Sequence, residues 1–289
     1  MGVRLNARIL FVALVAGVVC DAPGQTLYLI DGKKVVARVL RRQGDSIMAQ
    51  SPKVDNGQEL QGEVGYPLSQ IERLEFPVPA VLRAAPDMIA QGKAADALAQ
   101  LESPLNYYAS FRDAPGSYWG DIAILKLTAL IALSKDSEAE PLGKQIAQQA
   151  TNPETVRAAQ ARLAGIAARR GEHEQAIKIL DDVLRESSTP ATLAAAAVNK
   201  AASHFALKQW NRALLTYLQV PVFFPEQKAV VPQYMLGAAR CYFEIEDYTR
   251  AKSQLNDLLK DYASAPEAGP AKVELEKIAR REKALETVK

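Results

Sequence analysis

The chain has 289 residues, of which 48% are hydrophobic and 24% are charged, so it is long enough to bury a sizeable core and too apolar to be disordered. Lys and Arg number 35 against 33 Asp and Glu, and the net charge of +2 gives no reason to expect a nucleic acid or an anionic membrane surface as a partner. We therefore expect a folded protein without a polyelectrolyte ligand.

Residues 1–24 have the pattern of a secretory signal peptide. Arg4 and Arg8 precede an apolar run of 11 residues, whereas a membrane-spanning helix needs roughly 17 to 25. Small residues favour cleavage after Gly24, and cleavage before Cys20 would instead give a lipoprotein. We expect an exported protein, periplasmic or envelope-associated, whose membrane contact is limited to the signal segment or to a lipid on Cys20.

Residues 25–79 have the alternation of short β-strands. The alternating runs are separated by Asp31–Gly32 and Gly44–Asp45, dipeptides typical of hairpin turns. The pattern predicts a small, strongly bent sheet or barrel. The segments DGKKVVARV and GYPLSQIERLEF resemble the Sm-like and SH3-like small β-barrels. Pro77 and Pro79 then end the strand pattern and mark a domain boundary.

Residues 80–264 have a helical period and are repetitive. An alanine that follows a short polar turn recurs at steps of 42, 37, 37 and 38 residues. These alanines are Ala97, Ala139, Ala176, Ala213 and Ala251. Four residues after each, on the same helix face, stand Leu101, Gly143, Leu180, Tyr217 and Leu255. Each unit is expected to be a helix, a turn and a second helix, with the first unit truncated and Gly143 an irregular position.

These units resemble tetratricopeptide repeats, in which a small residue, an aromatic, an alanine and a large apolar residue recur in order. The unit QYMLGAARCYFEIEDYTRAKSQLNDLLKDY carries Ala239, Tyr242, Ala251 and Leu255 in those places. The resemblance implies a mainly α-helical solenoid of helix hairpins that follows the small β-rich module. Residues 265–289, with apolar residues on one side and charges on the other, are expected to form a C-terminal capping helix.

The histidines and Cys241, the residue types with catalytic potential, are expected to have structural roles in turns and in the core. Gly171 is expected to end a helix in a left-handed conformation, with His173 solvated in the turn that follows. His204 falls on a buried helix face, and Cys241 is expected to be a small buried hydrophobe. No motif for a catalytic, cofactor or metal site is present. We expect a protein that is not an enzyme, and an unrecognised enzyme is the remaining alternative.

A solenoid of this kind offers a concave surface lined mainly by the first helix of each pair. The resemblance places a small, apolar wall with two arginines there, suited to an apolar peptide or partner helix that carries an acidic group. The expected partner-binding residues are Ile124, Arg169, Val198, Phe205, Leu236, Arg240 and Phe243. Alternatively, these residues pack neighbouring repeats or the protein fills its own groove.

Aromatic residues gather where the repeat spacing lengthens to 42 residues. Tyr107, Tyr108 and Trp119 are expected to lie on this loop, residues 107–119, where they would pack against the barrel or the first helices. Alternatively, they would bind a glycan or peptidoglycan. The sequence thus predicts a non-catalytic adaptor of the bacterial cell envelope with protein partners, and a glycan-binding envelope protein is the second interpretation.

Overall fold

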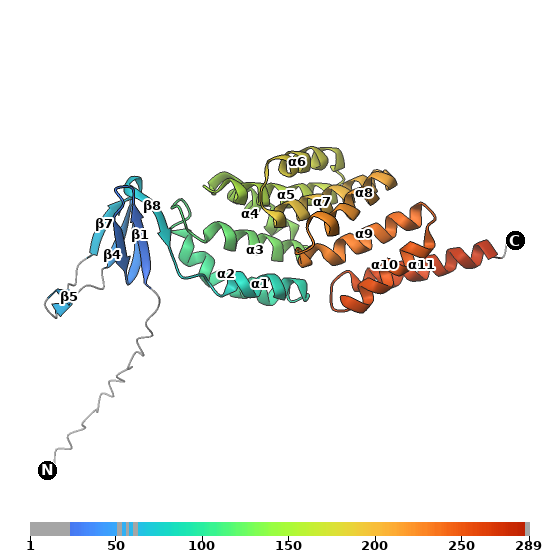
Figure 1. The fold of residues 1–289 in the computed structure, drawn as a ribbon, viewed down its shortest axis with the longest axis horizontal. Coiled ribbons are helices and arrows are strands. Elements are labelled where there is room, and N and C mark those ends of the chain that lie inside the picture. Colours follow the sequence, from blue (N-terminus) through green and yellow to red (C-terminus); the bar gives the residue numbers. More distant parts are fainter. Residues whose placement is uncertain (1–23, 51–53, 56–57, 60–62, 287–289) are drawn as a thin grey trace, which may run out of the picture.

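The computed structural model describes residues 24–50, 54–55, 58–59 and 63–286. A small β-module occupies one end of an elongated molecule, and paired helices stack away from it toward the C-terminus (Figure 1). The expected order of a β-rich module followed by a helical solenoid is therefore observed.

The β-module is an antiparallel meander folded into two small sheets. One sheet has the order β2-β1-β8 and the other β3-β4-β7. The strands are β1 (Gln25–Leu29), β2 (Lys34–Ala37), β3 (Val39–Gln43), β4 (Ser46–Gln50), β7 (Glu63–Pro67) and β8 (Ile71–Glu75), with the short pair β5 (Val54–Asp55) and β6 (Gln58–Glu59) between β4 and β7. A 3-10 turn, η1 (Leu68–Gln70), precedes β8, which returns to pair with β1.

The expected strands form because their apolar residues alternate. Leu27, Leu40, Ile47 and Leu74 are buried between the two sheets, each no more than 3% exposed. The run KKVVARVL does not make one strand: it breaks at Arg38, whose backbone N–H donates to the Gln50 carbonyl. This break lets β2 and β3 belong to different sheets, which bends the module into a barrel-like shape.

The rest of the described chain forms five helix pairs and one further helix. The pairs are α1 (Val81–Ala90) with α2 (Ala94–Ala109), α3 (Trp119–Ala132) with α4 (Asp136–Gln149), α5 (Pro153–Arg169) with α6 (His173–Glu186), α7 (Pro190–Ala206) with α8 (Trp210–Phe223), and α9 (Val231–Glu244) with α10 (Tyr248–Asp261). A 3-10 turn, η2 (Lys228–Val230), precedes α9, and α11 (Ala268–Glu286) ends the stack. The first unit, truncated in sequence, still forms a complete pair.

Every pair has the same turn. Five residues before each repeat alanine, the backbone is left-handed, with φ of 77° at Gly92, 56° at Ser134, 90° at Gly171, 59° at Lys208 and 63° at Glu246. The next residue donates its N–H across the turn to the first helix, for example from Glu172 to the Ala167 carbonyl at 3.1 Å. This is the Schellman arrangement, and all five repeat alanines have 0% exposure.

The irregular Gly143 is explained by its neighbour. A Cβ at this position would lie 2.8 Å from the Leu163 side chain and 3.4 Å from that of Leu127. The space that a large residue fills in the other units is thus occupied from α5. In the fourth unit the large residue is in the second helix and the glycine is in the next unit. The ring of Tyr217 packs on Gly237 of α9, and a Cβ on Gly237 would lie 2.2 Å from that ring.

The β-module is fixed to the helices by an aromatic junction. Phe76, which follows β8, packs its ring 5.1 Å from Tyr108 and 5.3 Å from Phe111 between centroids. The Arg42 guanidinium makes two hydrogen bonds to Asp113, of 3.2 and 3.1 Å. The apolar cores of the module and of the first two helix pairs are continuous.

A backbone contact completes this junction. The N–H of Leu74 in β8 donates to the Pro115 carbonyl at 2.7 Å, so the loop between α2 and α3 lies along the edge of β8. Gly116 in that loop has φ of 85°, and a Cβ there would lie 2.0 Å from the Leu74 carbonyl oxygen. Only glycine fits at this point of contact.

Gly116→Ala is therefore expected to destabilise the protein by about 3 kcal/mol or more, since a steric clash adds to the cost of the left-handed backbone. Gly32→Ala is the matched control, because its φ of 83° is within 2° of that of Gly116 while nothing lies within 4 Å of the added Cβ. It should cost only about 1 kcal/mol. Thermal unfolding followed by circular dichroism compares the two, and equal losses would contradict the close contact.

Candidate functional site

The surface predicted to bind a partner is formed by the first helices of the pairs. Helices α1, α3, α5, α7 and α9 contact one another in series, as a solenoid requires. The residues that the sequence placed on this wall are not equally open. Val198 is 5% and Leu236 7% exposed, and both pack in the core of the last repeats. The expectation that these two line an open surface is corrected by their burial, whereas Ile124 and Phe205 are half-buried.

Both arginines expected to meet an acidic partner group already have one within the chain. Arg169 donates to both carboxylate oxygens of Asp136, at 2.9 and 2.5 Å, and lowers the pKa of that carboxyl. Arg240 donates through Nε to Glu274 of α11 at 2.8 Å. The charge of each arginine is thus already compensated by a carboxylate of the chain, so neither arginine is open in the way the sequence suggested.

The capping helix covers the fifth unit. Besides the pair of Arg240 with Glu274, the Lys277 ammonium lies 4.1 Å from the ring centroid of Phe243, which also packs on Tyr248 at 5.5 Å. Phe243, expected to bind a partner, is thus held by the chain's own α11. Here the alternative that the protein covers its own surface describes the structure.

The end of the predicted binding surface that α1 forms is also covered by another part of the chain. The superhelix brings α1 into contact with η2, the turn before α9. A Cβ at Gly92, just after α1, would lie 3.5 Å from the Ser264 carbonyl in the loop before α11, and Figure 1 shows α1 ending beside that loop. The first helix pair therefore closes toward the last, and the open part of the surface is centred on α3, α5 and α7.

Arg162 lies in that central part and was missed by the sequence analysis. Its Nε donates to Thr128 Oγ1 at 2.8 Å, and its Nη1 to the Ala158 carbonyl at 2.9 Å. Both acceptors are neutral, and no carboxylate pairs with Arg162 among the described residues. Burial lowers its pKa to about 10. The register assumed from the repeats, which selected Arg169, did not include this residue on the binding face.

The neighbouring helix contributes a polar group to the same region. Asn199 of α7 donates its Nδ2 to the Ala161 carbonyl at 3.2 Å. A Cβ on Gly165 of α5 would lie 3.0 Å from that nitrogen. The glycine lets α5 and α7 approach closely, so that Arg162, Thr128 and Asn199 come from three successive first helices. The Arg162 guanidinium has three N–H groups beyond those in these two hydrogen bonds, and such a group is suited to binding a carboxylate.

Among the described residues, the two histidines and Cys241 are held within the packing of the helices. His204 is 8% exposed, as expected for a core residue, and its Nδ1 lies 2.7 Å from Gln209 Oε1. The expectation that His173 is solvated is wrong: it begins α6 and is half-buried, and its buried Nδ1 has no partner among the described residues. Burial raises the pKa of the Cys241 thiol to about 12, so it is a poor nucleophile.

The part of the chain that the structure describes has neither a cluster of metal ligands nor a membrane-spanning helix. There, no group of three or more His, Cys, Asp or Glu side chains is placed to hold a metal ion. Over the same residues no helix is both long enough and apolar enough to cross a membrane. The predicted signal segment, with Cys20, lies outside the described residues except for Gly24.

The aromatic cluster is a structural junction rather than a binding loop. Tyr107 and Tyr108 lie in the last turn of α2, and Trp119 is the first residue of α3, so the expectation that all three lie on a loop is corrected. Trp119 is 4% and Tyr108 6% exposed. Tyr107 is 43% exposed and accepts a hydrogen bond from Gln25 Nε2 at 3.0 Å. The rings of Tyr108 and Trp119 are too buried to stack on a sugar.

The fold has recognisable relatives. The sequence model of the tetratricopeptide repeat family matches residues 233–265, which include α9 and α10. This chain forms a tetratricopeptide-like α-solenoid behind a small β-rich module, a fold that is typically non-catalytic. No curated protein sequence matches the chain.

Three solved structures are similar in part. A tetratricopeptide repeat protein from Parabacteroides merdae is 19% identical over 56% of this chain and 60% of its own, with a TM-score of 0.38. A kinesin-light-chain-type protein from Podosopora anserina with nearly identical TPR-like repeats is 19% identical over 63% and 94%, with a TM-score of 0.41. Bacillus thuringiensis PlcR, solved with the peptide PapR7 and DNA, is 11% identical over 73% and 77%, with a TM-score of 0.47. The matched region thus spans less than two thirds of the first of these proteins.

Arg162→Met is expected to leave the melting temperature equal to or above that of the wild type, because it removes a desolvated charge that has no acidic partner. Arg157→Met on the same helix is the control, since Arg157 pairs with Glu154 at 3.1 Å and with Glu186 at 3.7 Å. Its loss should cost about 1 kcal/mol. Differential scanning calorimetry measures both, and a fall of several degrees for Arg162→Met would show that this arginine is structural.

Proposed function

We propose that the protein is a non-catalytic interaction scaffold of the bacterial cell envelope that binds a segment of a partner protein along α3, α5 and α7. The observation that carries the proposal is the guanidinium of Arg162, which donates hydrogen bonds to neutral groups and has no carboxylate partner among the described residues. The repeat fold supports a role in protein binding, because stacked helix pairs offer an extended surface for another chain.

The chemistry of the face indicates the chemistry of the partner. The neighbouring first helices carry small and apolar residues on the predicted binding face, such as the half-buried Ile124 of α3 and the exposed Ala202 of α7. A desolvated cation gains most from a carboxylate that makes charge-assisted hydrogen bonds to it. We infer that the bound segment is apolar and carries an Asp, a Glu or a terminal carboxylate. Charged pairs elsewhere on the face, such as Arg169 with Asp136, limit where that carboxylate can bind.

Site-specific photocross-linking tests this proposal in the envelope fraction of the native bacterium. A photoreactive residue at the exposed Ala202 should give one discrete adduct, and one at the exposed Asn256 of α10 should not. Arg162→Met should reduce the adduct about tenfold or more, since it removes a charge-assisted contact of about 1.5 to 3 kcal/mol. Arg157→Met should leave it unchanged. An adduct of equal yield in Arg162→Met would contradict binding at this face.

Export is a separate part of the proposal and has its own test. Residues 1–24 fused to an alkaline phosphatase that lacks its own signal should give an active enzyme, because that reporter requires an oxidising compartment. Leu14→Glu, which interrupts the apolar run, should abolish the activity. Cys20→Ser distinguishes the two processing routes, because it removes a lipid only if Cys20 is the modified residue. Reporter activity without residues 1–24 would contradict the assignment.

A further inference from the structure

The outer face of α8 is apolar in a way that the neighbouring units are not. Leu215, Val222 and Phe223, which we call the α8 strip, are 65%, 70% and 65% exposed. At the same repeat positions α6 carries Lys178, Arg185 and Glu186, and α10 carries Ser253, Lys260 and Asp261. The core of this unit does not need the strip, because Ala213, Tyr217 and Val220 already fill it. Exposed apolar side chains grouped in this way mark an interaction surface.

A hollow adjoins the strip. Between α6, α7 and α8 lies a cavity of about 420 Å³, whose lining includes Ile177, Arg212, Leu215 and Thr216. Leu215 therefore belongs both to the strip and to the wall of the hollow. Helix α8 packs on α7 and α9, and Figure 1 shows it at the outer side of the solenoid, away from the β-module.

Two opposite charges flank the strip without a partner. In the described residues neither the Arg212 guanidinium nor the Glu226 carboxylate makes an ion pair. Arg212 lies one turn before Leu215, and Glu226 lies three residues after Phe223. Both are exposed. Within one chain the Arg212 guanidinium and the Glu226 carboxylate lie at opposite ends of the strip, so they do not form an ion pair with each other.

We propose that the α8 strip is the interface of a homodimer in which two α8 helices pack antiparallel about a two-fold axis at Gln219. In such an interface the same patch faces itself. Gln219 lies midway between Leu215 and Phe223, and also midway between Arg212 and Glu226. A single axis therefore places Leu215 opposite Phe223 of the second copy. It also brings Arg212, one turn before Leu215, to the end of the second copy's strip, where the chain leaves α8 and continues to Glu226.

The antiparallel dimer also gives the cavity beside Leu215 an occupant. The axis brings Phe223 of the second copy to Leu215, at the edge of the cavity, so that an exposed ring on each copy meets a hollow on the other. Aromatic anchors that fill pockets dominate the energy of protein interfaces. Two crossing helices cover less than the roughly 800 Å² per partner of a standard interface, so we expect a reversible dimer rather than a permanent one.

Charge reversal and rescue test the dimer in sedimentation equilibrium experiments on the protein isolated after export. Arg212→Glu and Glu226→Arg should each weaken dimerisation tenfold or more, because each places like charges opposite one another. The double variant should restore the Kd to within about threefold of the wild type. Phe223→Ala should weaken it at least tenfold.

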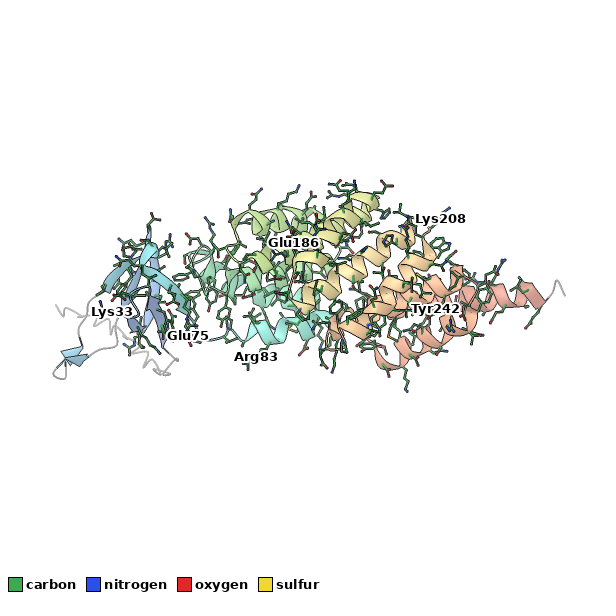
Figure 2. All side chains as sticks on the ribbon, turned by 45° about the horizontal axis from the view of Figure 1, so that its top comes forward. Lys33, Glu75, Arg83, Glu186, Lys208 and Tyr242 are labelled. Carbon is green, nitrogen blue, oxygen red and sulfur yellow. The ribbon has the colours of Figure 1, made fainter. Side chains whose placement is uncertain are left out.

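Arg83→Glu is the control for the change of charge. Arg83 is exposed on α1, and Figure 2 shows it far from Lys208, which precedes α8. This variant should dimerise like the wild type. The altered residues are exposed, so each variant should melt at the temperature of the wild-type monomer. A wild type that stays monomeric up to 200 µM, or a double variant without rescue, would overturn the proposal; binding of a different protein to the strip would then be the remaining use of this surface.

Discussion

The solenoid depends on one local constraint that occurs five times, a left-handed residue five positions before a fully buried alanine. The turn ends the first helix at a defined residue, and the alanine lets the second helix approach it closely. Because each unit contacts mainly its neighbours, the small rotation set by this turn accumulates along the stack. It brings α1 to η2 and Gly92 to Ser264, so a local backbone preference determines how much of the concave surface stays open.

The phase of the repeats was visible in the sequence because buried alanines recur at a nearly constant step. The left-handed turn was expected only at Gly171, since Ser134, Lys208 and Glu246 carry side chains that disfavour this conformation by about 1 kcal/mol or more. In those units packing of the flanking helices outweighs the local preference. The small volume of Gly143 is likewise explained only by Leu163 of the next unit, a contact between residues far apart in sequence.

The partner-binding surface was less predictable for a related reason. Whether an arginine is available depends on carboxylates some thirty residues away, such as Asp136 for Arg169 and Glu274 for Arg240. A sequence pattern does not reveal those pairs, and it gave no reason to single out Arg162. The aromatic cluster was assigned to a loop although Tyr107 and Tyr108 complete α2, because the longer repeat step of 42 residues suggested an extended connection there. Its packing role followed correctly from the general tendency of aromatic area to be buried.

The Arg162 guanidinium and the α8 strip lie on different faces of the solenoid, and this separation has a functional consequence. Arg162 is on the face of the first helices, whereas the α8 strip is on the exposed side of a second helix. Pairing through α8 would leave both concave faces of a dimer open.

A partner with two acidic segments, or an array of partners, would then bind with an effective concentration set by the rigid distance between the faces. The aromatic junction fixes each β-module to the other end of its solenoid, so a dimer of this kind would carry the two modules at its periphery. In such a dimer, weak binding at each concave face is compatible with a stable assembly. Once one face has bound the partner, binding at the second face is intramolecular.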